Sequence, residues 1–174
     1  KFTEFKEFYQ NSFDSLMLLA VPMFISTWVL ADKIMVFVAG PEFVSSGTML
    51  RLLAVAIFGV YLGAVFGHTA VAIGQQKATM WIYISDAIIT FAGYMYAIPR
   101  YGWMGAAAFT IFSELYAGIS LAWVVSKHTP TSLSLARFGK IILAGAIMGG
   151  VLWFTIDLPI IALVIEGAIL YIVA

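Results

Sequence analysis

The sequence contains no cysteine and only two histidines, and charged residues make up only 10% of its 174 positions. Without cysteine there is no disulfide framework, no thiolate metal site and no thiol redox chemistry. His68 and His128 are too few and too far apart for a histidine-rich metal site, so we expect no metal and no cofactor. About a quarter of the residues of a soluble domain are charged, so this chain has too little polar surface for a water-soluble globule. The composition therefore excludes a soluble enzyme, a nucleic-acid binder and a disordered tail.

The charges that are present exclude further classes of partner and reaction. Nine Lys and Arg residues balance nine Asp and Glu residues, so no net field would attract nucleic acid or another highly charged partner. The sequence has no glycine-rich phosphate loop and no HExxH or GxSxG motif, and its polar breaks are too short for a catalytic domain outside a membrane. These absences favour transport over catalysis, and we do not expect an enzyme.

Apolar residues make up 63% of the chain, and its mean hydropathy is +1.01. A helix that spans the hydrocarbon core of a bilayer needs about 20 apolar residues, and the sequence offers six such stretches between polar breaks. They cover residues 13–39, 48–73, 78–98, 105–126, 138–155 and 158–174. None of them alternates between apolar and polar residues as a membrane β-strand does. The sequence therefore predicts an all-α, polytopic membrane helix bundle with about six transmembrane helices.

The first 13 residues differ from the rest of the chain. Aromatic residues recur there at three- and four-residue spacing with Lys and Glu opposite them, which predicts an amphipathic helix in the membrane interface. We divide the chain into this lead-in helix at 1–13, a four-helix part at 14–127 and two further transmembrane helices at 128–174. Because the chain begins without Met and ends inside an apolar run, we expect a fragment that is truncated at both ends and lacks spans on its N-terminal side.

The loop charges predict the orientation of the chain. Cytoplasmic loops of membrane proteins carry an excess of Lys and Arg. The segments on the side of the N-terminus hold six such residues and the opposite segments hold three, which places the N-terminus in the cytoplasm. The two sets are Lys1, Lys6, Lys77, Lys127, Arg137 and Lys140 against Lys33, Arg51 and Arg100.

Two acidic residues lie near the middle of predicted spans, where an ionised side chain costs about 2.5–3.5 kcal/mol. Asp86 belongs to a stripe of small and polar residues at helical spacing, and such a stripe faces protein or a water-filled cavity. The full stripe is Thr79, Tyr83, Asp86, Thr90, Gly93 and Ala97. Asp86 either lines a transport pathway or is a buried acid that a neighbouring helix satisfies. Glu114 lies in the next span, which a loop of about six residues joins to the span of Asp86, so both carboxylates could face one cavity and share a proton for proton-coupled transport.

Other polar residues are weaker candidates for the pathway. His68 is either a hydrogen-bonded packing residue or a proton relay, and the surroundings of Glu166 are hidden by the end of the chain. Arg51 contacts an anionic headgroup or anchors a helix end, and we expect Asp32 and Lys33 to reach the outer interface by extending their side chains.

Glycines and one proline point to helix packing and shape. Gly59, Gly63 and Gly67 form a ladder at four-residue spacing in the second span, and Gly145 and Gly149 repeat that spacing in the fifth. Small residues four apart let membrane helices approach closely. Pro22 removes a backbone hydrogen bond inside the first span, which predicts a kink.

The loop sequences resemble those of polysaccharide flippases, the Wzx-type O-antigen and capsule exporters of the multidrug/oligosaccharidyl-lipid/polysaccharide (MOP) superfamily. The resemblance rests on three short segments and on their order and spacing, and it covers about residues 13–127. The segments are IPRYGWMGAA at 98–107, GPEF at 40–43 followed by MLRLL at 49–53, and AIGQQK at 72–77.

The resemblance implies the C-terminal half of a 14-helix protein of the bacterial cytoplasmic membrane, with this chain as helices nine to fourteen. It implies two lobes that rock around a central cavity and an undecaprenyl-diphosphate-linked oligosaccharide as cargo, used for lipopolysaccharide or capsule. The partners would be this cargo, membrane lipids and the remaining N-terminal helices of the same protein. By the same similarity the last two helices border a groove for the lipid tail. Two alternatives are a MATE-like exporter of drugs or small molecules and, from another class, a membrane glycan polymerase or ligase.

Overall fold

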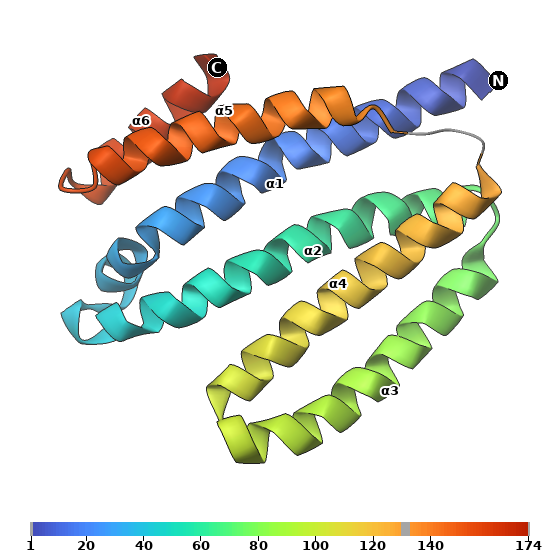
Figure 1. Cartoon of the computed structure of the whole chain (residues 1–174), viewed down its shortest axis with the longest axis horizontal. Helices are drawn as coiled ribbons and strands as arrows, with labels where there is room; N and C mark the ends of the chain where they lie inside the picture. The colour runs from blue at the N-terminus through green and yellow to red at the C-terminus, as the bar shows by residue number, and fades with distance from the viewer. Residues whose placement is uncertain (1, 130–132, 174) are drawn as a thin grey trace. The chain divides into compact units, whose positions relative to one another are not determined.

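The computed structural model describes residues 2–129 and 133–173, and these residues form six α-helices and one 3-10 helix, with no strand among them (Figure 1). The elements are α1 (Phe2–Ala39), η1 (Pro41–Ser46), α2 (Gly47–Ala72), α3 (Gln76–Tyr101), α4 (Trp103–His128), α5 (Leu135–Phe154) and α6 (Ile160–Val173). All the helices from α1 to α5 are long and apolar enough to cross a membrane, and α6 is a shorter apolar helix. The predicted all-α, polytopic membrane helix bundle is confirmed.

The chain divides into two compact units, and neither is a continuous stretch of sequence. One unit contains α1 up to Leu16, α2 from Val55 onward, α3 and α4. The other contains α1 from Met17 onward, η1, α2 up to Ala54, α5 and α6. Both α1 and α2 therefore contribute to each unit.

The prediction of a loop of about six residues between the spans of Asp86 and Glu114 is wrong. The helix α3 continues through Pro99 to Tyr101, and Gly102 alone separates it from α4. Gly102 has a φ of 57° and a ψ of −135°, a combination that residues with a Cβ rarely adopt. Its N–H donates to the carbonyl of Ile98 at 2.8 Å, so one glycine both ends α3 and starts α4. The two helices form an antiparallel pair, called the α3–α4 hairpin below (Figure 1).

The beginning of α1 packs on α2 within the first unit. Tyr9 and Phe13 are buried, and their rings lie 6.5 and 6.2 Å from the ring of Phe66 in α2. Phe8, the residue directly before Tyr9, is 75% exposed. The segment expected as a lead-in helix is thus the start of one uninterrupted 38-residue helix with one face against α2.

The second unit has its own apolar core. Leu30 of α1, Met148 and Leu152 of α5 and Leu163 of α6 are almost fully buried and pack together. Gly145 and Gly149 allow α5 to lie close to α1: a Cβ at Gly145 would come within 2.6 Å of Val21, and one at Gly149 within 2.6 Å of Ile25. The glycine spacing noted in the fifth span therefore lies at a contact between α5 and α1.

Candidate functional site

Asp86 lies on the face of α3 that packs against α4. Its side chain is 9% exposed and accepts hydrogen bonds from Ser113 of α4 at 2.7 Å and from Thr90, one turn along α3, at 3.2 Å. A buried carboxylate with two hydroxyl donors has partners for both oxygens, which offsets much of the cost of removing it from water. This is the contact expected of a buried acid that a neighbouring helix satisfies.

The rest of the polar stripe follows the same face. Its members Thr79, Asp86, Thr90, Gly93 and Ala97 are the buried residues of α3, while Tyr83 is 47% exposed. The two helices approach closely near the turn at Gly102. There a Cβ at Gly93 would collide with the Phe109 ring, and one at Gly105 would come within 2.5 Å of the Ala97 carbonyl oxygen. Of the two alternatives for this stripe, protein or a water-filled cavity, its buried residues lie on the face of α3 that contacts α4.

Two further hydrogen bonds join α3 and α4 on either side of Asp86. The hydroxyls of Ser85 and Tyr116 lie 2.9 Å apart, and those of Tyr94 and Thr110 lie 2.8 Å apart. Interhelical hydrogen bonds of this kind contribute roughly 0.6 kcal/mol each inside a membrane protein. Together with the Asp86–Ser113 bond they fix an antiparallel register along most of the hairpin.

Glu114 lies at the contact between α4 and α2 and is half-buried. A Cβ at Gly59 of α2 would stand 2.8 Å from the Glu114 Cβ and 3.1 Å from its carbonyl carbon. Asp86 of α3 and Glu114 of α4 belong to the same compact unit. Within this unit Asp86 contacts α4 and Glu114 contacts α2.

The remaining glycines of the α2 ladder make looser contacts. A Cβ at Gly63 would meet no atom within 4 Å, and one at Gly67 would lie 3.4 Å from the Tyr83 hydroxyl, an ordinary van der Waals distance. Gly118 of α4 completes the contact, because a Cβ there would lie 3.2 Å from Leu62 and 3.4 Å from the Gly59 carbonyl oxygen. The close approach of α2 to α4 is therefore centred on Gly59 and Gly118.

His68 lies in the last two turns of α2. It is exposed and lines a cavity of about 500 Å³ between the start of α1 and the end of α2, together with Phe5 and Tyr9. The cavity that His68 lines includes neither Asp86 nor Glu114. Among residues 2–129 and 133–173, no group of three or more His, Asp or Glu side chains is arranged to hold a metal ion.

Arg51 is held by protein groups in the second unit. Its guanidinium forms an ion pair with Asp32 at 2.7 Å and donates to the carbonyl of Trp28 at 3.1 Å, which ties the start of α2 to α1. A Cβ at Gly47 would collide with the Asp32 carboxylate, so the absence of a side chain at Gly47 leaves room for this pair. Lys33 donates to the carbonyl of Leu158, between α5 and α6, at 2.8 Å.

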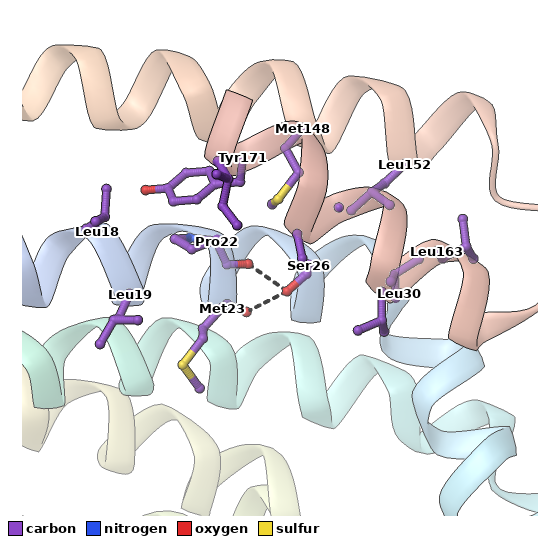
Figure 2. A pocket seen from close by; sticks show the side chains of 14 residues that line it. Leu18, Leu19, Pro22, Met23, Ser26, Leu30, Met148, Leu152, Leu163 and Tyr171 are labelled. Atoms are coloured by element: carbon purple, nitrogen blue, oxygen red, sulfur yellow. Dashed lines mark hydrogen bonds between the residues drawn. The ribbon is translucent and has the colours of Figure 1, made fainter. Parts of the chain in front are cut away.

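An apolar groove of about 390 Å³ lies among α1, α5 and α6 of the second unit (Figure 2). Ser26 and Tyr171 are the only lining residues with polar side chains. The Ser26 hydroxyl donates to the carbonyl of Pro22 at 2.6 Å, so it is turned back onto its own helix. Pro22 has no N–H, so the carbonyl of Leu18 on the groove wall lacks its usual helical donor. The lining residues are Leu18, Leu19, Pro22, Met23, Ser26, Leu30, Met148, Leu152, Leu163, Val164, Gly167, Ala168, Tyr171 and Ile172.

No protein-family profile, curated protein or solved structure matches the chain.

Sequence reasoning missed the partners of the acidic residues and one residue of the groove. Ser113 lies one position before Glu114, and its role as a donor to Asp86 follows only from the register of the hairpin. The Tyr171 hydroxyl is the one buried side-chain polar atom without a hydrogen-bond partner in the part of the chain that the structure describes. Glu166, in α6, accepts a hydrogen bond from Thr155 at 2.9 Å. Helical spacing from the intramembrane acid could have indicated Thr90, four residues after Asp86, but not Ser113.

Proposed function

We propose that this chain is the C-terminal part of a polysaccharide flippase of the MOP superfamily. In this proposal the protein moves an undecaprenyl-diphosphate-linked oligosaccharide across the bacterial cytoplasmic membrane by alternating access, and the N-terminus of the chain lies in the cytoplasm. The sequence resemblance suggests the cargo, and the loop charges suggest the orientation.

The observation that carries the proposal is the apolar groove of the second unit. Its volume of about 390 Å³ falls in the range of ligand pockets, roughly 300–1,000 Å³. Two exposed residues of its α1 wall, Leu18 and Leu19, and two of its α6 wall, Val164 and Ile172, present hydrocarbon to a ligand. A polyisoprenoid chain offers only apolar surface, so it gains from such a wall and leaves no polar atom of its own unsatisfied.

The polar interior of the first unit supports the same proposal in a second way. An oligosaccharide crosses a membrane only if hydroxyls and carboxylates line its path. Asp86 and Glu114 are such groups, held at the meeting of α2, α3 and α4. One of the hydrogen bonds of Asp86 comes from Ser113 of α4, so a change in the packing of α3 against α4 would free that carboxylate oxygen for a ligand.

A groove-filling substitution tests the proposal. Ala168 lines the groove and is exposed, so Ala168→Trp would occupy the groove without displacing a buried side chain. In cells that lack the chromosomal gene, we expect the full-length gene carrying Ala168→Trp to restore much less surface or periplasmic glycan than the wild type. Ala162→Trp is the matched control, because Ala162 is an exposed alanine of the same helix outside the groove lining.

Membrane fractions of both variants should contain equal amounts of protein. Equal glycan from the two variants would remove the groove from the mechanism. Drug resistance conferred by the gene without any glycan phenotype would replace the flippase proposal with a small-molecule exporter.

A further inference from the structure

Two exposed tryptophans frame a cavity at one end of the α3–α4 hairpin. Trp81 of α3 is 58% exposed and Trp123 of α4 is 63% exposed, and both line a cavity of about 550 Å³. Ser120 is the only other lining residue with a polar side chain, and the rest of the lining is aliphatic: Ala78, Ile82, Ile119 and Val124. The cavity is thus an apolar slot with an indole on each helix.

Two lysines lie one helical turn beyond the tryptophans at the same end of the hairpin. The register fixed by Asp86–Ser113 and Ser85–Tyr116, continued toward the start of α3, sets Trp81 opposite Trp123 and then Lys77 opposite Lys127. The Lys127 Nζ lies 5.0 Å from the centre of the Trp123 ring, which is a cation–π contact. Both ammonium groups are exposed.

The sequence around these lysines has no negative charge. Residues 71–85 and 115–136 contain no Asp or Glu, so Lys77 and Lys127 have no acidic neighbour nearby in the sequence of either helix of the hairpin. The closest acids in sequence, Asp86 and Glu114, lie further along the helices, and Asp86 is buried against α4. This end of the hairpin therefore combines two lysines that have no acidic residue near them in the sequence with an apolar slot.

We propose that this end of the hairpin, the lysine–tryptophan slot, binds one anionic phospholipid of the surrounding bilayer. The lipid phosphate lies between Lys77 and Lys127, the indoles of Trp81 and Trp123 flank the glycerol region, and an acyl chain follows the slot along Ile82. Tryptophan rings favour the level of the headgroups, and basic sites between transmembrane helices bind anionic headgroups. A zwitterionic lipid would bind more weakly, because the cation of its own headgroup offsets the attraction between its phosphate and the two lysines.

The test measures lipid binding to the full-length protein in detergent by native mass spectrometry. The probes are phosphatidylglycerol and phosphatidylcholine with identical acyl chains. We expect phosphatidylglycerol to bind in preference to phosphatidylcholine. Each of Lys77→Gln and Lys127→Gln should weaken phosphatidylglycerol binding about 5-fold, and the double variant about 30-fold. Lys140→Gln, which removes an exposed lysine of α5, is the control and should change nothing.

A second measurement locates the lipid. Phosphatidylglycerol brominated near the headgroup should quench the tryptophan fluorescence of the wild type more than that of Trp81→Phe/Trp123→Phe. Equal binding of the two lipids, or unchanged phosphatidylglycerol binding by the Lys77→Gln and Lys127→Gln variants, would overturn the proposal. Displacement of phosphatidylglycerol by inorganic phosphate at equal concentration would also overturn it, since the ligand would then be a soluble phosphate. None of these results depends on whether the protein flips a glycan.

Discussion

Replacing single glycines of α2 with alanine should give sharply different results at Gly59 and Gly63. A Cβ at Gly59 would stand 2.8 Å from the Glu114 Cβ and 3.1 Å from its carbonyl carbon, whereas carbon atoms prefer separations of about 3.5–4.0 Å. Neither atom is the free end of a flexible side chain, so α2 and α4 must move apart. Overpacking of this kind costs about 1–3 kcal/mol, and we expect Gly59→Ala to lower the free energy of unfolding by that amount.

Gly63→Ala is the matched control, because it adds the same methyl group one turn away on the same helix. No atom lies within 4 Å of a Cβ at Gly63, so the substitution should leave the free energy of unfolding unchanged or raise it slightly. The assay is unfolding of the detergent-solubilised protein in increasing denaturing detergent, followed by helical circular dichroism. Equal destabilisation by the two substitutions would refute the reasoning, since it would mean that the spacing of the glycines and not the contact at Gly59 determines the effect.

Three other substitutions test the carboxylates and the buried hydroxyl beside the groove. Asp86→Asn keeps the size of the side chain and an oxygen that accepts a hydrogen bond, and like Glu114→Gln it removes a charge. Each substitution should lower glycan flipping while the amount of protein in the membrane stays the same. Wild-type periplasmic glycan accumulation in both variants would exclude the carboxylates from transport. Tyr171→Phe removes a buried hydroxyl that has no hydrogen-bond partner among residues 2–129 and 133–173. The substitution should therefore raise the free energy of unfolding, measured by thermal unfolding, by about 1 kcal/mol. A decrease would show that the hydroxyl has a hydrogen-bond partner in the solubilised protein.

The sequence predicts the helices well because the bilayer imposes a strict rule. Backbone polar groups must be paired within each segment that crosses the hydrocarbon, so length and apolar content suffice to find the helices. The stripe containing Asp86 was predictable for the same reason, since one face of α3 is polar or small and the others are apolar. The length of the α3–α4 connection was not predictable from the sequence. A proline usually indicates the end of a helix, yet Pro99 lies inside the last turn of α3.

Contacts between helices were less predictable. The glycine ladder indicates close packing somewhere along α2, but not that the contact is tight at Gly59 and open at Gly63. The ion pair of Arg51 with Asp32 joins residues 19 positions apart on two helices, and its formation depends on the turn made by η1 between them. Which residue faces which helix is set by rotation and register, and these depend on all the neighbours at once.

The discontinuity of the two units has a consequence for the biogenesis of the protein. The part of α1 that lines the apolar groove is synthesised before α2, α3 and α4, whereas the opposite wall belongs to α5 and α6. At about 5–20 residues per second, several seconds of translation separate the two walls. During that interval lipid or an insertion factor must cover Leu18 and Leu30 of α1. The α3–α4 hairpin, by contrast, can assemble as soon as it enters the membrane, because its two helices are adjacent in the chain. The groove is therefore the last feature of the second unit to form, and a ribosome that stalls before α6 would leave the groove without its α6 wall.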